Sequence, residues 1–163
     1  MIILICFGYI LTIHFCDFLN DFNCIVNDYV IYKNLSNDNL INFVNKCVFQ
    51  YKHYYLGAIF EELIFRLPLL YFNNNNFIFG FLVFIFCIQH YDKNKKIKTN
   101  IQTLTHSMIL GYLFSSITNL YSTIFYSIAL HLLNNLLSVF IILPYDFKKK
   151  NPRLVLDYLN QNK

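Results

Sequence analysis

Two glutamates and an arginine interrupt a long apolar stretch of this sequence. Glu61, Glu62 and Arg66 lie between residues 55 and 72, where most of their neighbours are large apolar side chains. Ionisable groups are expensive at bilayer depth and usually serve a function there. On a helix, Glu62 and Arg66 are four residues apart and can form an ion pair. Such a pair makes the burial of both charges tolerable.

Glu61 is expected to have a different environment from Glu62, because adjacent helical residues point about 100° apart around the axis. A carboxylate that is buried without a cation of its own becomes more basic, and this suits a general base working near neutral pH. From these residues alone, an ion network that only locks helices together explains the cluster equally well.

Two further polar groups interrupt apolar segments of the chain. His90 follows the apolar run 77–89, which contains Phe86, while His131 and Asn135 are four residues apart and share one helix face. Taken singly, such groups are more often interhelical hydrogen-bonding residues than catalysts. Combined with the glutamates on three separate segments, they would supply a base, a proton-shuttling imidazole and two groups that stabilise an oxyanion.

Composition indicates that these residues belong to an integral membrane protein. The chain has 163 residues, of which 56% are hydrophobic and 13% charged, whereas a soluble domain has about 25% charged residues. The five cysteines lack CxxC spacing and indicate buried free thiols rather than a zinc or disulfide framework. The alternative is a soluble helical protein with a large core.

We expect an all-α, polytopic membrane helix bundle, with four core helices that carry the motifs and a further helix at the N-terminus. The stretch Ser36-Asn-Asp-Asn39 offers N-caps for a helix that begins near Leu40 and stops after Pro68, and Pro144 is expected to end the last core helix. The core helices are expected at residues 40–68, 77–89, 103–120 and 122–143.

Three parts are expected along the chain. Residues 1–45 form an N-terminal hydrophobic segment and linker, residues 46–145 form the core, and residues 146–163 form a basic tail with one short amphipathic turn. Residues 1–16 are either a signal peptide or a short first membrane helix.

Lysine runs predict the orientation in the membrane, because lysines concentrate in short cytoplasmic loops. One run is Lys93, Lys95, Lys96 and Lys98, and the other is Lys148 to Lys150. Two apolar segments separate the runs, so both can be cytoplasmic, which places the C-terminus in the cytoplasm. Nucleic-acid binding is disfavoured, because these runs flank apolar segments and lack interleaved aromatic residues. The oligomeric state is not predicted.

The order of the three motifs resembles the CPBP family of intramembrane proteases. The motifs are EExxxR at 61–66, FxxxH at 86–90 and HxxxN at 131–135, and the stretch from Leu110-Gly111 to His131 is also similar. The family includes Rce1-like type II CAAX prenyl endopeptidases and the bacterial bacteriocin-processing and Abi relatives. The resemblance covers about residues 58–143 and implies that the core is a CPBP-like intramembrane protease.

The resemblance also implies a role for each motif residue. Glu61 would activate water with help from His90, while His131 and Asn135 would stabilise the oxyanion. The residues that would support the site are Glu62, Arg66 and Phe86. Water would attack the peptide carbonyl directly, without an acyl-enzyme. A metal-free mechanism is favoured because no HExxH signature is present; the alternative is zinc held by Glu61, His90 and His131.

The motif residues can meet at one site only if the helices bring them to the same depth in the membrane. His90 lies a few residues from the lysine loop, whereas His131 lies thirteen residues before Pro144, about 20 Å along a helix. We therefore expect tilted helices or a last helix that projects into the cytoplasm.

The substrate implied by the resemblance is a cytoplasmic protein tail with a prenylated cysteine, cleaved after that cysteine. In a eukaryotic cell the host membrane would be the endoplasmic reticulum. One alternative is a protease for unlipidated peptides, as in bacteriocin processing or immunity. Another is a non-catalytic membrane scaffold of the same fold. The intact motif set, including Glu61, favours an enzyme over a scaffold.

Overall fold

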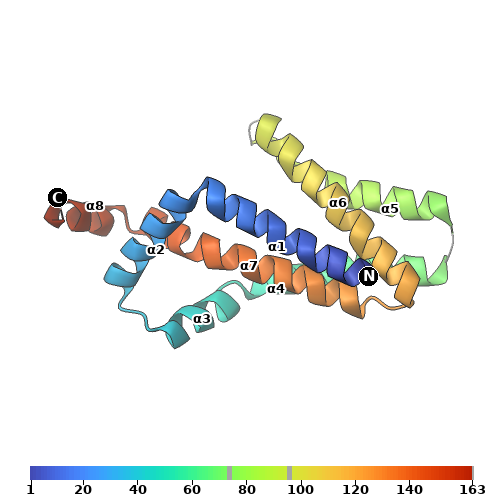
Figure 1. The fold of residues 1–163 in the computed structure, drawn as a ribbon, viewed down its shortest axis with the longest axis horizontal. Helices are drawn as coiled ribbons and strands as arrows, with labels where there is room; N and C mark the ends of the chain where they lie inside the picture. Colours follow the sequence, from blue (N-terminus) through green and yellow to red (C-terminus); the bar gives the residue numbers. More distant parts are fainter. Residues whose placement is uncertain (73–74, 95–96, 163) are drawn as a thin grey trace. The chain divides into compact units, whose positions relative to one another are not determined.

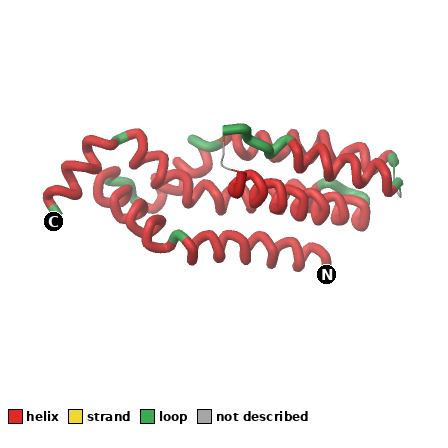
Figure 2. The backbone as a smooth tube through the Cα atoms, turned by 90° about the horizontal axis from the view of Figure 1, so that it is seen from above, coloured by secondary structure: helices red, strands yellow, loops and turns green. Residues whose placement is uncertain are grey.

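The structure is a computed structural model that describes residues 1–72, 75–94 and 97–162, and every regular element in these ranges is a helix (Figure 2). The all-α prediction is therefore confirmed. The helices are α1 (Ile2–Asn20), α2 (Phe22–Ser36), α3 (Leu40–Phe49), α4 (Lys52–Tyr71), α5 (Asn76–Ile88), α6 (Ile97–Tyr121), α7 (Phe125–Lys150) and α8 (Pro152–Gln161) (Figure 1). Lys95 and Lys96 of the predicted lysine loop lie outside the described residues.

The chain divides into two compact units. Unit 1 contains Met1–Tyr9 and Leu56–Leu132, and unit 2 contains Ile10–Tyr55 and Leu133–Lys163. Helices α1, α4 and α7 each contribute residues to both units. The predicted three-part division of the chain stays a prediction.

In unit 1, α5 packs along α6 (Figure 1). Asn75 begins α5, because its side-chain oxygen accepts hydrogen bonds from the backbone N–H groups of Phe77 and Ile78, both at 3.1 Å. Gly111 of α6 allows the two helices to approach closely. A Cβ atom at this position would lie 2.8 Å from Cδ1 of Phe86, which is too short for a real contact.

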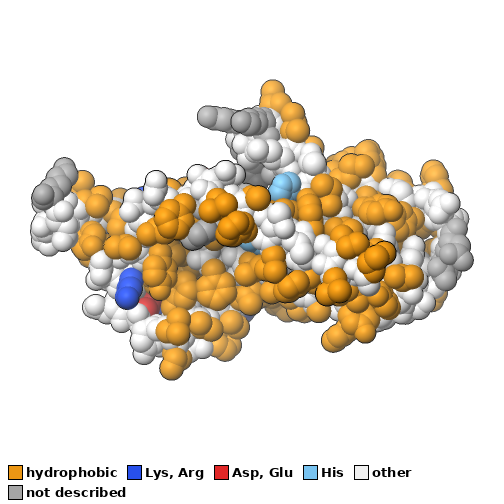
Figure 3. Space-filling model, viewed as in Figure 1, with side chains coloured by type: hydrophobic (Ala, Val, Ile, Leu, Met, Phe, Trp, Pro, Cys, Tyr) orange, Lys and Arg blue, Asp and Glu red, His pale blue; other side chains and the backbone are white. Residues whose placement is uncertain are grey.

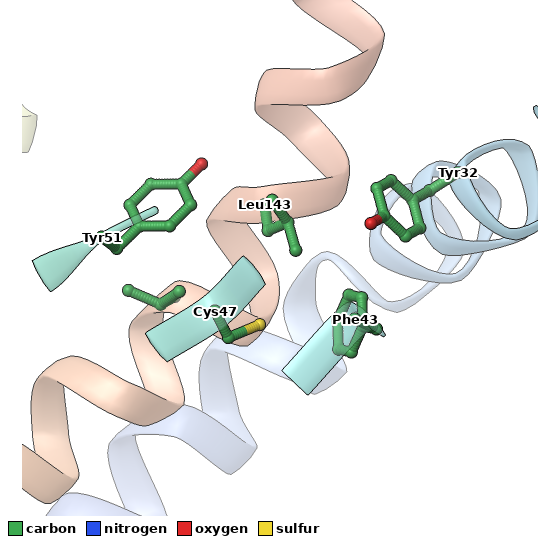
Figure 4. Close-up of a cluster of buried hydrophobic side chains, with 6 residues drawn as sticks. Tyr32, Phe43, Cys47, Tyr51 and Leu143 are labelled. Carbon is green, nitrogen blue, oxygen red and sulfur yellow. The ribbon is translucent and has the colours of Figure 1, made fainter. Parts of the chain in front are cut away.

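Unit 2 is built around an apolar core (Figure 4). The buried core residues come from α2, α3, the α3–α4 junction and α7, and they are Tyr32, Phe43, Cys47, Tyr51, Val139 and Leu143. Tyr32 and Phe43 meet edge to face with their ring centroids 5.5 Å apart. Helix α8 packs on α2, and Asn34 donates a hydrogen bond to the Tyr158 hydroxyl at 2.7 Å. Residues 152–161 of the tail thus form a ten-residue helix, and the prediction of a single short turn was wrong.

The predicted helix over 40–68 is wrong in its length, although its start is confirmed. Of the predicted capping stretch 36–39, Asn39 is the residue that caps α3, since its side chain accepts a hydrogen bond from the Asn42 backbone N–H at 2.8 Å. The helix then breaks between Phe49 and Lys52. Tyr51 is buried at this break, and its hydroxyl donates to Asp146 at 2.8 Å. This contact is distant in sequence, so local patterning could not reveal the break.

Two prolines do not end their helices, contrary to the prediction. Helix α4 continues past Pro68 to Tyr71, and α7 continues past Pro144 to Lys150. A proline inside a helix costs about 3 kcal/mol, so the following turn needs other support. After Pro144 that support comes from Asp146, which binds Tyr51, and from Lys148, whose Nζ lies 2.7 Å from Oδ1 of Asp28.

Several other segments differ from their predicted limits. Residues 22–36, expected to be part of a linker, form α2; α6 begins at Ile97 rather than at residue 103, and α7 begins at Phe125 rather than at residue 122. Polar residues obscured the helical pattern in the first two cases, and the start of α7 is later because Ser122 has a positive φ of 51°, which a right-handed helix cannot contain.

Among the described helices, α7 alone is both long and apolar enough to cross a membrane by length and composition, while Ile2–Cys16, Leu40–Phe49 and Asn76–Ile88 are shorter apolar helices. Large apolar side chains are exposed on both units, and Figure 3 shows how widely they cover one face. Phe60 and Ile64 of α4, for example, are 62% and 61% exposed. Such extensive apolar exposure is unusual in soluble monomers. The number of spans and the position of the C-terminus stay predictions.

Candidate active site

The Glu62–Arg66 pair lies at the centre of unit 1. Both side chains are fully buried, and Arg66 Nε lies 3.3 Å from Glu62 Oε2. The predicted ion pair, one turn apart on α4, is therefore present. Burial in this environment keeps water away from both charges, so each depends on the other for stabilisation.

Aromatic rings surround the guanidinium of Arg66. Its central carbon lies 4.4 Å from the ring centroid of Phe86, 5.8 Å from that of Phe114 and 6.0 Å from that of Phe65. In the described part of the chain, no acceptor forms a hydrogen bond with its nitrogen atoms. Cation–π attraction to the rings therefore supplements the ion pair with Glu62.

His131 of α7 lies between the two glutamates. Its Nδ1 is 2.9 Å from Oε1 of Glu62, and its Nε2 is 3.8 Å from Oε2 of Glu61. The first distance is a hydrogen bond, in which Nδ1–H donates to the carboxylate. The ring is 7% exposed and also packs on Phe114, with centroids 5.5 Å apart. Glu62 thus fixes both the tautomer and the direction of the His131 ring.

The two glutamates have different environments, as expected for adjacent helical residues, but Glu61 is partly exposed rather than buried. The side chain of Glu61 is 33% exposed, whereas that of Glu62 is fully buried. Of the two glutamates, Glu61 is therefore the one that can meet a water molecule or a substrate. Its Oε2 faces the ring nitrogen of His131 that Glu62 leaves free.

His90 follows the C-terminal end of α5 and is tied to the same group through Phe86. Its Nδ1 donates to the Phe86 carbonyl at 2.8 Å, and its ring lies 4.9 Å from the Phe86 ring. The Phe86 ring also lies 6.2 Å from the ring of His131. The two histidines, distant in sequence, are therefore brought to one aromatic residue, as convergence requires. No hydrogen bond between His90 and Glu61 is present in the described residues.

Asn135 lies one turn beyond His131 on α7, and its contacts are within unit 2. Its Nδ2 donates to the Tyr54 backbone carbonyl at 3.0 Å. The carboxamide has a second N–H, which this hydrogen bond leaves available.

Sequence analysis placed Gly111 and Phe114 in the stretch that is similar to the family but gave neither residue a role in the site. Phe114 is fully buried against Arg66 and His131. Gly111 makes room for the Phe86 ring. The sequence signal that could have indicated this close packing is Gly111 itself, a small residue within the apolar segment before the third motif.

No three His, Cys, Asp or Glu side chains within residues 1–72, 75–94 and 97–162 are grouped so that they could hold a metal ion. The alternative zinc ligands Glu61, His90 and His131 do not form such a group, and His131 is already hydrogen-bonded to Glu62. We derive no step through zinc. Metal dependence stays a prediction.

Comparison with known families gives a match to the motif-bearing part of the chain. Residues 45–137, more than half of the chain, match the type II CAAX prenyl endopeptidase Rce1-like family. The matched range contains all three motifs, from Glu61 to Asn135. Comparisons with curated proteins and with solved structures gave no match. Membrane embedding and protease activity are properties of this family. The chain is therefore a member of the Rce1-like family of type II CAAX prenyl endopeptidases.

Proposed function

We propose that this protein is an intramembrane endopeptidase that cleaves prenylated CAAX-type tails, with Glu61 as the base that activates water. One observation carries this proposal: His131 is held by the fully buried Glu62, and its free nitrogen faces the partly exposed Glu61. A fixed imidazole beside an accessible carboxylate is a suitable arrangement for attack by water on a peptide carbonyl.

In the proposed reaction, Glu61 removes a proton from water as the water oxygen bonds to the carbonyl carbon. The carbonyl oxygen becomes an oxyanion. When the tetrahedral intermediate collapses, the C–N bond breaks and Glu61 returns the proton to the leaving amine. The 33% exposure of Glu61 supports this role, because the base must meet both water and substrate.

His131 is proposed to stabilise the oxyanion. Because Nδ1–H is committed to Glu62, the donor to the oxyanion must be Nε2, which carries a hydrogen when the ring is protonated. Glu62 and Arg66 keep the ring in place. Asn135, the last residue of the HxxxN motif, is proposed as the second donor. His90 assists Glu61, since its Nδ1–H is committed to the Phe86 carbonyl and its Nε2 is free to accept a proton.

The proposed substrate is the lipidated C-terminal tail of another protein, presented at the cytoplasmic side of the membrane. Family membership supports this substrate class, and the exposed apolar side chains of unit 1 are compatible with an isoprenoid. Cleavage of unlipidated peptides and a non-catalytic scaffold are the rival outcomes of the test.

The test uses the full chain in proteoliposomes with a farnesylated tail peptide and the same peptide without the lipid. Wild type is compared with Glu61→Gln and His131→Ala, and Asp157→Asn on the exposed face of α8 is the matched carboxylate control. Loss of a general base costs about 10²- to 10⁴-fold in rate, so Glu61→Gln is expected to lower kcat by at least 100-fold. The Asp157→Asn variant is expected to behave as wild type.

Each alternative function predicts a different outcome of this cleavage assay. Activity that survives Glu61→Gln contradicts the mechanism, and equal cleavage of both peptides contradicts the lipid-tail substrate. No cleavage of either peptide by wild type indicates a scaffold. Activity that persists after strong chelation argues against the zinc alternative, and activity that returns only with zinc supports it.

A further inference from the structure

A histidine outside the three motifs and outside the family match reaches the third motif through hydrogen bonds. His14 is on α1, and its Nε2 lies 3.3 Å from Oδ1 of Asn134. The family match begins at residue 45. Asn134 is the residue next to Asn135, the proposed second oxyanion donor.

The contacts continue beyond Asn134. Its Nδ2 donates to Oδ1 of Asn135 at 3.5 Å, a long contact, and Nδ2 of Asn135 donates to the Tyr54 backbone carbonyl at 3.0 Å. All four residues belong to unit 2. Side chains from the N-terminal helix and from α7 are thereby connected to the backbone of α4.

The Tyr54 carbonyl fixes the direction of every hydrogen bond in this chain. A carbonyl can only accept, so the end of Asn135 that faces it must be the amide nitrogen. The Asn135 oxygen then accepts from Asn134, and the Asn134 oxygen in turn requires a donor. His14 provides that donor when Nε2 carries the hydrogen, which holds both for the Nε2–H tautomer and for the protonated ring.

We propose that His14 is a positioning residue of the protease, which acts through Asn134 to hold the Asn135 carboxamide with one Nδ2–H on Tyr54 and the other available to the oxyanion. This inference rests on the proposed function of Asn135. Without His14, the Asn134 side chain loses the donor to its oxygen and keeps the long 3.5 Å contact to Asn135. Both amides are then less restrained, and rotation of the Asn135 amide removes its aimed donor.

His14 also lines an open, mainly apolar groove of about 530 Å³, together with Leu11, Thr12, Phe15 and Leu137. Phe15 therefore offers a matched control, because it contributes to the same groove without belonging to the hydrogen-bond chain. His14→Gln keeps an N–H donor, whereas His14→Leu removes it and preserves the apolar character of α1.

The experiment measures kcat and KM of the full chain in proteoliposomes. We expect His14→Leu and Asn134→Leu each to lower kcat about tenfold with KM changed less than twofold, which is the effect of one lost hydrogen bond of about 1.4 kcal/mol. We expect His14→Gln to remain within about threefold of wild type, and Phe15→Leu to leave kcat unchanged. In an Asn135→Ala background, His14→Leu should have no further effect, because the two residues act as one unit.

The outcomes distinguish the oxyanion role of Asn135 from the positioning role of His14. If Asn135→Ala is fully active, the proposed oxyanion role fails. If Asn135→Ala is impaired but His14→Leu is not, or if the two effects simply multiply, the positioning role of His14 is overturned.

A second readout does not depend on activity. With ¹⁵N-labelled asparagine, the side-chain NH₂ signal of Asn135, assigned by its loss in Asn135→Ala, should shift in His14→Leu and return in His14→Gln. An Asn135 signal that is the same in His14→Leu and Phe15→Leu would overturn the inference, even for a protein that cleaves nothing.

Discussion

The two units use charged residues in opposite ways. In unit 1, Glu62 and Arg66 are both fully buried, whereas in unit 2 the pairs Asp28–Lys148 and Asp38–Lys46 each join a nearly buried aspartate to a lysine that is 40% or 44% exposed. The unit 2 distances are shorter, 2.7 and 2.6 Å against 3.3 Å in unit 1. The distance between two charges therefore does not show how strongly each charge depends on its partner. The buried pair is the longer one, yet its charges have no water to stabilise them.

The difference indicates what each region needs from its charges. Exposed lysines are hydrated whether or not they are paired, so their ion pairs contribute little and are screened by salt. The buried pair of unit 1 gains little net stability, but removal of one partner leaves the other charge stranded. In unit 1 the buried pair also holds His131, because Glu62 accepts a hydrogen bond from its ring. Four predictions test this contrast between the units, from the largest expected effect to the smallest.

Removal of the buried cation should produce the largest change in stability. Arg66→Met leaves Glu62 without its partner in an apolar site and is expected to lower the free energy of unfolding by about 3–5 kcal/mol. The measurement is an unfolding titration with sodium dodecyl sulfate in mixed micelles. The control is the double variant Glu62→Gln/Arg66→Met, which has no stranded charge and should recover most of the loss. A double variant as unstable as Arg66→Met would show that ring packing, rather than charge, dominates at this site.

Filling the space at Gly111 should have the next largest effect. A methyl group there would meet Phe86, which contacts Arg66 and both site histidines, so Gly111→Ala is expected to destabilise the protein by about 1–3 kcal/mol. Gly80→Ala on α5 is the matched control, since nothing lies within 4 Å of its added Cβ. That variant should be neutral or up to about 1 kcal/mol more stable, because alanine favours helices. Equal effects of the two substitutions would contradict the close approach of α6 to Phe86.

The ion pair at the end of α7 should contribute less. Asp28→Asn removes the carboxylate and leaves Lys148, which is 40% exposed and stays hydrated, so this variant is expected to cost about 0.2–1 kcal/mol. The loss should shrink as salt is raised from 50 mM to 1 M, whereas the loss in Arg66→Met should stay nearly constant. Salt-insensitive destabilisation by Asp28→Asn would remove the contrast between the units.

The smallest expected change in stability is the one that acid produces at Asp38, in the α2–α3 connection. Burial acts to raise the pKa of this carboxyl, but hydrogen bonds from Lys46 and Tyr32 outweigh it and hold the pKa below its ordinary value. A carboxyl with a lowered folded-state pKa stabilises the protein above its unfolded-state pKa, about 4, and loses that contribution as the pH falls through the folded-state value. Wild type should therefore approach the stability of Asp38→Asn as the pH is lowered below about 4. A constant difference between the two proteins from pH 7 to pH 2.5 would contradict this assignment.

Local patterns in the sequence determined much of this protein. Apolar runs predict the all-α class, Asn39 marks the start of α3, and the i,i+4 spacing of Glu62 and Arg66 predicts their ion pair. Three short motifs in order indicate the family that the match over residues 45–137 establishes. The helix start, the ion pair and each single motif depend on residues within one or two turns of each other, so the order of residue types is sufficient to reveal them.

Contacts between distant residues decided the rest. The helix break at Tyr51 and the passage of α7 through Pro144 both depend on Asp146, and the placement of His131 between two carboxylates depends on packing around Phe86 and Phe114. The link from His14 to Asn134 spans 120 residues. Propensity and spacing cannot encode such contacts, because their free energy arises only when burial brings the partners together. The sequence by itself determined which residues could do the chemistry, and the tertiary structure decided that Glu62 holds the histidine while Glu61 is accessible to water.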